Sequence, residues 1–81
     1  MSNSVSFEKL GRKCRITITN NSSTDRCTTS YRIGVFDSDD DRWEDHADTT
    51  TTLNPNTSHS QEYHKWSATD WNHTITNNYC E

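Results

Sequence analysis

Carboxylates dominate one short stretch of the sequence, DSDDDRWEDHAD at residues 37–48, where seven of twelve side chains are acidic. An EF-hand calcium loop takes its ligands from the first, third, fifth, seventh, ninth and twelfth places, and carboxylates fill five of these six. The sixth place, which needs the conformational freedom of glycine, is Arg42, and the last ligand is Asp instead of Glu. An EF-hand is therefore not expected. Two interpretations are left: a weak calcium site at Asp37, Asp39 and Asp41, or a solvated acidic loop between two strands.

The tryptophans offer a second kind of chemistry. In the sequence WSATDWN, two Trp residues flank an expected turn, with a carboxylate and an amide beside the second ring. Such rings stack on the C–H groups of sugars, while Asp and Asn read hydroxyl groups. The predicted ligand-binding residues are Trp43, Trp66, Asp70, Trp71 and Asn72. The competing interpretation is that two of the three Trp residues lie in the core, because aliphatic residues are few.

Catalytic and zinc motifs are absent from the sequence. The four His residues have no ligand spacing typical of zinc, and there is no Cys-x-x-Cys pair. No Ser, His and Asp or Cys and His pattern has the glycine-shaped context that a nucleophile needs. We therefore predict a protein that is not an enzyme, with no cofactor apart from the calcium considered above.

Three cysteines leave one unpaired if two form a bridge. Cys14 and Cys27 each share the apolar side of an expected strand, so we predict a disulfide between them. Cys80 is out of step with Ile75 and is then a free thiol or joins another chain. Three reduced cysteines acting as small hydrophobic residues are the alternative.

The supply of core residues is thin. Hydrophobic residues make up 27% of the 81-residue chain, against roughly 45–50%, glycine included, in an ordinary soluble domain. A single domain spanning residues 1–81 with so few aliphatic side chains needs further support, and the physical options are a disulfide, a metal or burial against other subunits.

The charge is unevenly distributed: residues 1–36 sum to +4 and residues 37–81 to −8. The basic run is short, so no nucleic-acid partner is expected. The asymmetry favours contact between copies through complementary fields, and thus a homo-oligomer. No apolar stretch is long enough to span a bilayer, and no signal-peptide core follows the start. A soluble protein is expected, in an undetermined compartment, and secreted or surface-exposed if it carries a disulfide.

Strand periodicity runs through the chain. Alternating apolar residues mark residues 14–21 and 27–36, and shorter candidates lie at 5–7, 49–53, 61–66 and 73–76, separated by turn-formers rich in Asn, Asp and Ser. The fold class predicted is all-β, a small antiparallel β-sandwich or barrel of six to seven short strands. Only residues 67–70 carry a helix-start pattern, worth one helical turn.

Two functions of different class fit these observations. The first is a non-enzymatic, lectin-like binding module that recognises a polar ligand such as a glycan. The second is a self-assembling structural protein, a fibre or shell subunit, held by strand addition, complementary charge and an interchain disulfide. A third, an enzyme or inhibitor acting on a macromolecule, is favoured by no particular residue.

Overall fold

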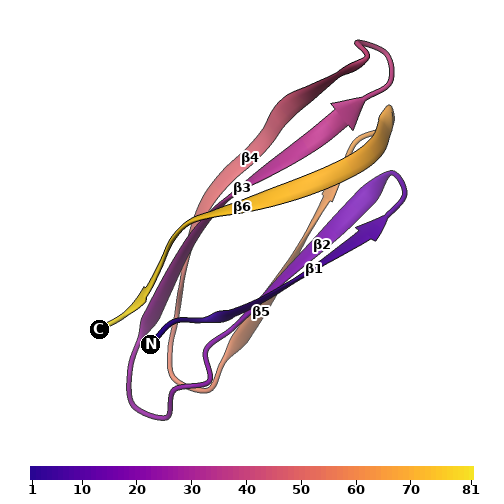
Figure 1. Ribbon diagram of the computed structural model, residues 1–81. Helices are drawn as coiled ribbons and strands as arrows, with labels where there is room; N and C mark the ends of the chain where they lie inside the picture. The colour runs from indigo at the N-terminus through magenta and orange to yellow at the C-terminus, as the bar shows by residue number, and fades with distance from the viewer.

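Six antiparallel strands make up the fold in the computed structural model, which describes residues 1–81. They form two three-stranded sheets, and no helix is present. Figure 1 shows the two sheets as layers of an elongated sandwich, with both termini toward one end. The predicted all-β sandwich is thus confirmed, with six strands: β1 (Ser4–Leu10), β2 (Lys13–Thr19), β3 (Cys27–Asp37), β4 (Arg42–Leu53), β5 (Ser58–His64) and β6 (Ala68–Cys80).

We call the β1-β2-β5 layer sheet A and the β4-β3-β6 layer sheet B. The central strand of each sheet supplies most of the core, because alternate residues of a strand point to the same face. In β2 the buried side chains are Cys14, Ile16 and Ile18, and in β3 they include Tyr31 and Ile33. The alternation in the sequence therefore predicted the inward faces of both central strands correctly.

Hydrogen bonds between the layers supplement this small core. The Tyr31 and Tyr63 hydroxyls lie 2.8 Å apart and join β3 to β5. At one side of the sandwich, Asn3 Nδ2 donates to Thr29 Oγ1 at 2.8 Å. At the other end of the molecule, Trp71 Nε1 donates a hydrogen bond to the Gly11 carbonyl oxygen in the β1–β2 turn at 2.8 Å. The Asn3–Thr29 bond is buried and the other two are partly buried, which matters in a domain with so little apolar surface to bury.

The disulfide joins Cys27 to Cys80, which are opposite each other on β3 and β6. The predicted Cys14–Cys27 bridge is therefore wrong, as is the expectation of a free or interchain thiol at Cys80. The physical reason is a β-bulge: Ser30 pairs with Asn77 and Tyr31 with Ile75, so one extra residue lies between them on β6. That residue reverses the alternation and turns Cys80 inward. Cys14 is the free, buried thiol.

Two local expectations are also corrected. The acidic stretch is not a long loop, because β3 continues to Asp37 and β4 begins at Arg42, so only residues 38–41 form the turn. Asp41 adopts φ +53°, which allows this tight reversal. The expected helical turn at residues 67–70 is absent, because Ala68 already pairs with Asp37 at the start of β6. No helix in the structure could cross a membrane.

Candidate functional site

The exposed side of sheet B carries the most available chemistry. Its three strands place side chains outward in five cross-strand rows, opposite to the buried residues of β3. We call this surface the outer face of sheet B. From one end to the other its rows, written in the order β4, β3 and β6, are Trp43, Phe36, Asp70; Asp45, Gly34, Asn72; Asp48, Arg32, Thr74; Thr50, Ser30, Asn77; and Thr52, Thr28, Tyr79.

An aromatic pair marks one end of this face. Trp43 and Phe36 are directly opposite in the β3–β4 ladder, and their rings meet edge to face with centroids 5.6 Å apart. Phe36 is half-buried, whereas 46% of Trp43 is exposed. Phe36 thus fixes the orientation of a tryptophan ring that keeps much of its surface free.

Hydroxyl pairs fill the other end. Thr28 and Thr52 lie 3.0 Å apart through their Oγ1 atoms, and Ser30 Oγ lies 2.8 Å from Thr50 Oγ1. A hydroxyl has one donor and two acceptor positions, so each pair keeps further hydrogen-bonding capacity toward solvent. Tyr79, 42% exposed, closes the row beside Thr28.

Gly34 keeps the middle of the face shallow. The Asn72 side chain lies directly over Gly34, where a Cβ atom would collide with its amide group. The absence of a side chain on β3 therefore lets a flat amide group occupy the central row. An amide that both donates and accepts is thereby held between the aromatic and hydroxyl ends.

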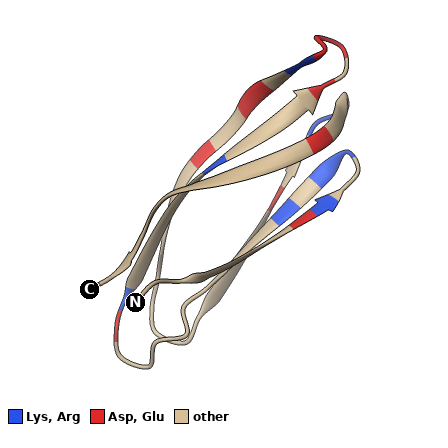
Figure 2. Ribbon diagram, in the orientation of Figure 1, with Lys and Arg blue, Asp and Glu red and all other residues tan.

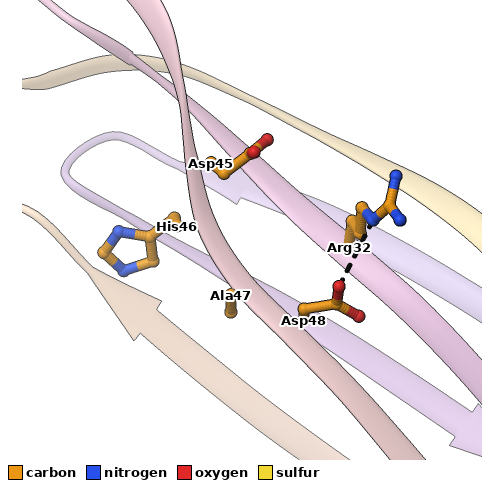
Figure 3. Close-up of a pocket in the computed structure, with 5 residues that line it drawn as sticks. All are labelled: Arg32, Asp45, His46, Ala47 and Asp48. Carbon is orange, nitrogen blue, oxygen red and sulfur yellow. Dashed lines mark hydrogen bonds and ion pairs between the residues drawn. The ribbon is translucent and has the colours of Figure 1, made fainter.

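A pocket of about 270 Å³ opens at the β4 edge of this face, lined by Arg32, Asp45, His46, Ala47 and Asp48. It lies where the β3–β4 register shifts, because Ile33 pairs with Ala47 and Gly34 with Asp45, leaving His46 as an extra residue. Figure 3 shows Asp45 and His46 projecting to opposite sides of β4, with Arg32 bridged to Asp48. The Arg32 Nε to Asp48 Oδ2 distance is 3.3 Å.

The bulge turns the His46 ring away from the outer face. The ring meets Tyr63 and Trp71 edge to face, with centroids 5.9 Å and 5.3 Å away. Burial lowers the pKa of His46, and the nearby Lys65 ammonium lowers it further. His46 is therefore a neutral packing residue and does not offer its imidazole to a ligand on the outer face.

The structure separates the predicted ligand-binding residues into three groups. Trp43, Asp70 and Asn72 share the outer face of sheet B. Trp71 does not: it is 1% exposed, and its Nε1 donates to the Gly11 carbonyl oxygen at 2.8 Å. The expectation that Trp71 contacts a ligand is wrong, because it pairs with Val35 on the inner face.

Trp66 stands apart, in the turn between β5 and β6. It is 71% exposed, and the guanidinium of Arg12 lies 3.8 Å from its ring centroid. This cation–π contact covers one ring face from the β1–β2 turn. Trp66 is therefore exposed as expected but lies off the surface that carries Trp43.

Asp70, another of the predicted ligand-binding residues, forms an ion pair with Lys9. Lys9 Nζ lies 2.9 Å from Asp70 Oδ1, and the Trp71 amide also donates to this carboxylate. The Lys9 hydrogen bond is the main reason that the pKa of Asp70 is lowered. Asp70 can still accept hydrogen bonds, since both side chains of the pair are about half exposed.

Carboxylates do converge in the acidic stretch, but in a different set from the predicted one. Oxygen atoms of Asp37, Asp40 and Glu44 lie within 4.8 Å of one another, whereas Asp39 and Asp41 are not part of the group. Figure 2 shows this acidic β3–β4 turn at the same end of the molecule as the basic β1–β2 turn. The prediction of a calcium site stays a prediction, with Asp37 as the shared residue.

The pKa values of two of these carboxylates, Asp37 and Glu44, are shifted in opposite directions. Hydrogen bonding by Ser67, together with the Asp39 amide, lowers the pKa of Asp37 to about 2. The hydrogen bond with Asp37 and the nearby Asp40 raise the pKa of Glu44. The Lys65 ammonium forms an ion pair with Asp37, with Nζ 3.6 Å from Oδ2. Asp37 thus holds its charge while Glu44 is disfavoured as an anion.

Several residues of the outer face were not predicted, notably Phe36, Tyr79, Arg32 and Asp48. The signal for Arg32 and Phe36 was present, because they alternate with the apolar residues of β3. The signal for Asp48 was hidden by the bulge at His46, and that for Tyr79 by the bulge in β6.

Comparisons with known proteins supply no further guide to the site. No family model matches the sequence, and neither the curated proteins nor the solved structures give a significant match. The geometry of the outer face of sheet B is therefore the best guide to function.

Proposed function

We propose that this protein is a non-enzymatic, lectin-like binding module that holds a glycan chain along the outer face of sheet B. The observation that carries the proposal is the half-exposed Trp43 ring, oriented by Phe36 and followed along the face by hydroxyl and amide groups. A glycan offers C–H faces to the ring and hydroxyl groups to the rest of the surface.

The dimensions of the face suit an extended ligand. An 11-residue strand such as β3 spans about 35 Å at roughly 3.3 Å per residue. The polar rows continue over that length, from the Asn72 amide beside Gly34 to the hydroxyl pairs at the other end. Binding is favoured over catalysis because the neighbouring imidazole, His46, is turned to the interior.

Replacement of Trp43 tests the proposal. We expect Trp43→Ala to weaken binding of an oligosaccharide that the native protein binds by about tenfold or more, because one aromatic anchor commonly dominates the binding energy. Isothermal titration calorimetry with a panel of neutral, acidic and amino oligosaccharides measures the affinity without depending on tryptophan fluorescence.

The matched control is Trp66→Ala. It removes a more exposed tryptophan that lies off the outer face of sheet B, so affinity should stay within about twofold. Equal losses in both variants would contradict the placement of the site. Absence of binding across the whole panel would remove the proposal itself.

Self-assembly is the second candidate function. The free edges of sheet B belong to β4 and β6, of 12 and 13 residues, and neither strand contains Lys or Pro. Long edges without these residues are open to strand addition. The acidic and basic turns at one end (Figure 2) add complementary charge between copies. An interchain disulfide is no longer part of this hypothesis, because Cys80 is bonded to Cys27. A mass in solution that stays monomeric as concentration rises would exclude it.

A further inference from the structure

We propose that the pocket at the β4 bulge binds the protonated amino group of an amino sugar, so that the preferred glycan is one with free amines. This inference rests on the proposed function and names its substrate class. The pocket lies beside the central rows of the outer face, where a chain stacked on Trp43 would pass.

The bulge places the two carboxylates on the same face of the sheet. Residues three apart on a regular strand point to opposite faces. Asp45 and Asp48 instead both lie on the outer face, since Asp45 pairs with Gly34, Asp48 pairs with Arg32, and the extra residue His46 intervenes. One inserted residue therefore builds a site with two carboxylates that a continuous strand could not form.

The charge of the pocket is negative. Arg32 is engaged with Asp48, whereas the Asp45 carboxylate has no ion-pair partner. His46 adds no positive charge, because its ring lies against Tyr63 and Trp71 and its pKa is lowered by burial. The pocket lining thus contains one guanidinium and two carboxylates, so its net charge is a single negative charge.

A sugar ammonium complements this arrangement. It has donors for Asp45 and for Asp48, and charge-assisted hydrogen bonds are stronger than those of a neutral hydroxyl or acetamide group. A sugar carboxylate or sulfate would instead meet the unmatched Asp45 charge. The volume of about 270 Å³ falls just below the roughly 300–1,000 Å³ of pockets for drug-sized ligands, which fits one sugar unit.

Three matched hexasaccharides test the inference. All are β-1,4-linked glucose chains, and they differ only at C2, which bears a hydroxyl, an acetamide or a free amine. At a pH where the amine is protonated, we expect calorimetry to show about tenfold tighter binding of the amino chain than of the other two. Asp45→Asn should reduce this preference to about twofold.

Asp25→Asn is the charge-matched control. Asp25 lies in the segment between β2 and β3, outside the pocket, so this variant should keep the full preference. Loss of the preference in both variants would reveal a general effect of net charge and overturn the pocket. Equal binding of all three chains would overturn the inference and leave the proposed function intact. Failure of all three chains and of the wider panel to bind would overturn both.

Discussion

Charged side chains are arranged in opposite ways in the two sheets. On sheet A, Arg15 lies between two carboxylates, with its Nη2 2.6 Å from Glu62 Oε2 and its Nη1 3.4 Å from Glu8 Oε1. The pKa of Glu62 is lowered, mainly by the hydrogen bond from Arg15. At the turn of sheet B, like charges crowd together, and the pKa of Glu44 is raised, mainly by its hydrogen bond with Asp37.

The difference indicates which face is free to bind. The ion pairs of sheet A satisfy each other across β1, β2 and β5, and no Phe, Tyr or Trp lies in those rows. Sheet B instead exposes Trp43 and Tyr79 and leaves Asp45 unmatched. Charges that are already paired, as on sheet A, give no indication of a ligand. Exposed aromatic surface and unpaired charge, as on sheet B, are features of binding sites.

A disulfide joins β3 to β6 in sheet B, and its loss should have the largest effect on the stability of the fold. Cys27 and Cys80 are 53 residues apart, and opening a loop of that size is expected to cost about 4 kcal/mol. Urea unfolding of the Cys27→Ala, Cys80→Ala double variant should show this loss relative to the oxidised native protein.

The control for this experiment is the reductant itself. Reduced native protein should match the double variant, which should not respond to reductant. The remaining thiol is inert in comparison, because burial raises the pKa of Cys14 to about 11. Equal stability of the native protein with and without reductant would contradict the role of the bridge.

The same disulfide illustrates what the sequence could and could not predict. Alternation in β2 and β3 correctly identified the inward residues, since these strands have few irregularities on their core side. It failed for Cys80, because a bulge inserts one residue and reverses every later position on that strand. No local pattern in Thr- and Asn-rich β6 marks the bulge between Ile75 and Asn77.

The candidate site was predicted only in part for a related reason. Trp43 was expected on a loop, yet it pairs with Phe36 because the turn closes within four residues. Trp71 has the same parity as Ile75, so its burial could have been inferred from alternation within β6. The hydroxyl rows depend on which strands become neighbours, and that is decided by the whole sandwich.

Two glutamate variants compare the electrostatics of the sheets directly. Because the pKa of Glu44 is raised in the folded state, its ionisation destabilises the fold as pH rises through and above the ordinary range for Glu. Glu44→Gln should therefore raise the melting temperature at neutral pH. The pKa of Glu62 is lowered, so its charge stabilises the fold above the ordinary range, and Glu62→Gln should lower the melting temperature there.

Both differences should vanish well below the ordinary Glu pKa, where each side chain is protonated in the folded and unfolded chain. Melting curves across the acid range test this, and shifts of the same sign in both variants would contradict the comparison.

Added calcium tests the metal prediction in the same assay. A calcium-dependent rise in melting temperature that Glu44→Gln removes would support a site at the acidic turn, and no rise would exclude one.

The smallest effect is expected from the ion pairs of sheet A, because exposed pairs add little to stability and are screened by salt. Arg15→Met keeps much of the aliphatic stem and removes the contacts with Glu8 and Glu62. We expect a slight decrease in melting temperature at about 0.01 M NaCl that disappears at about 1 M, where the Debye length falls to roughly 3 Å. Glycan affinity should not change. A weaker affinity in this variant would place the binding surface on sheet A, since Arg15 contributes nothing to the outer face of sheet B.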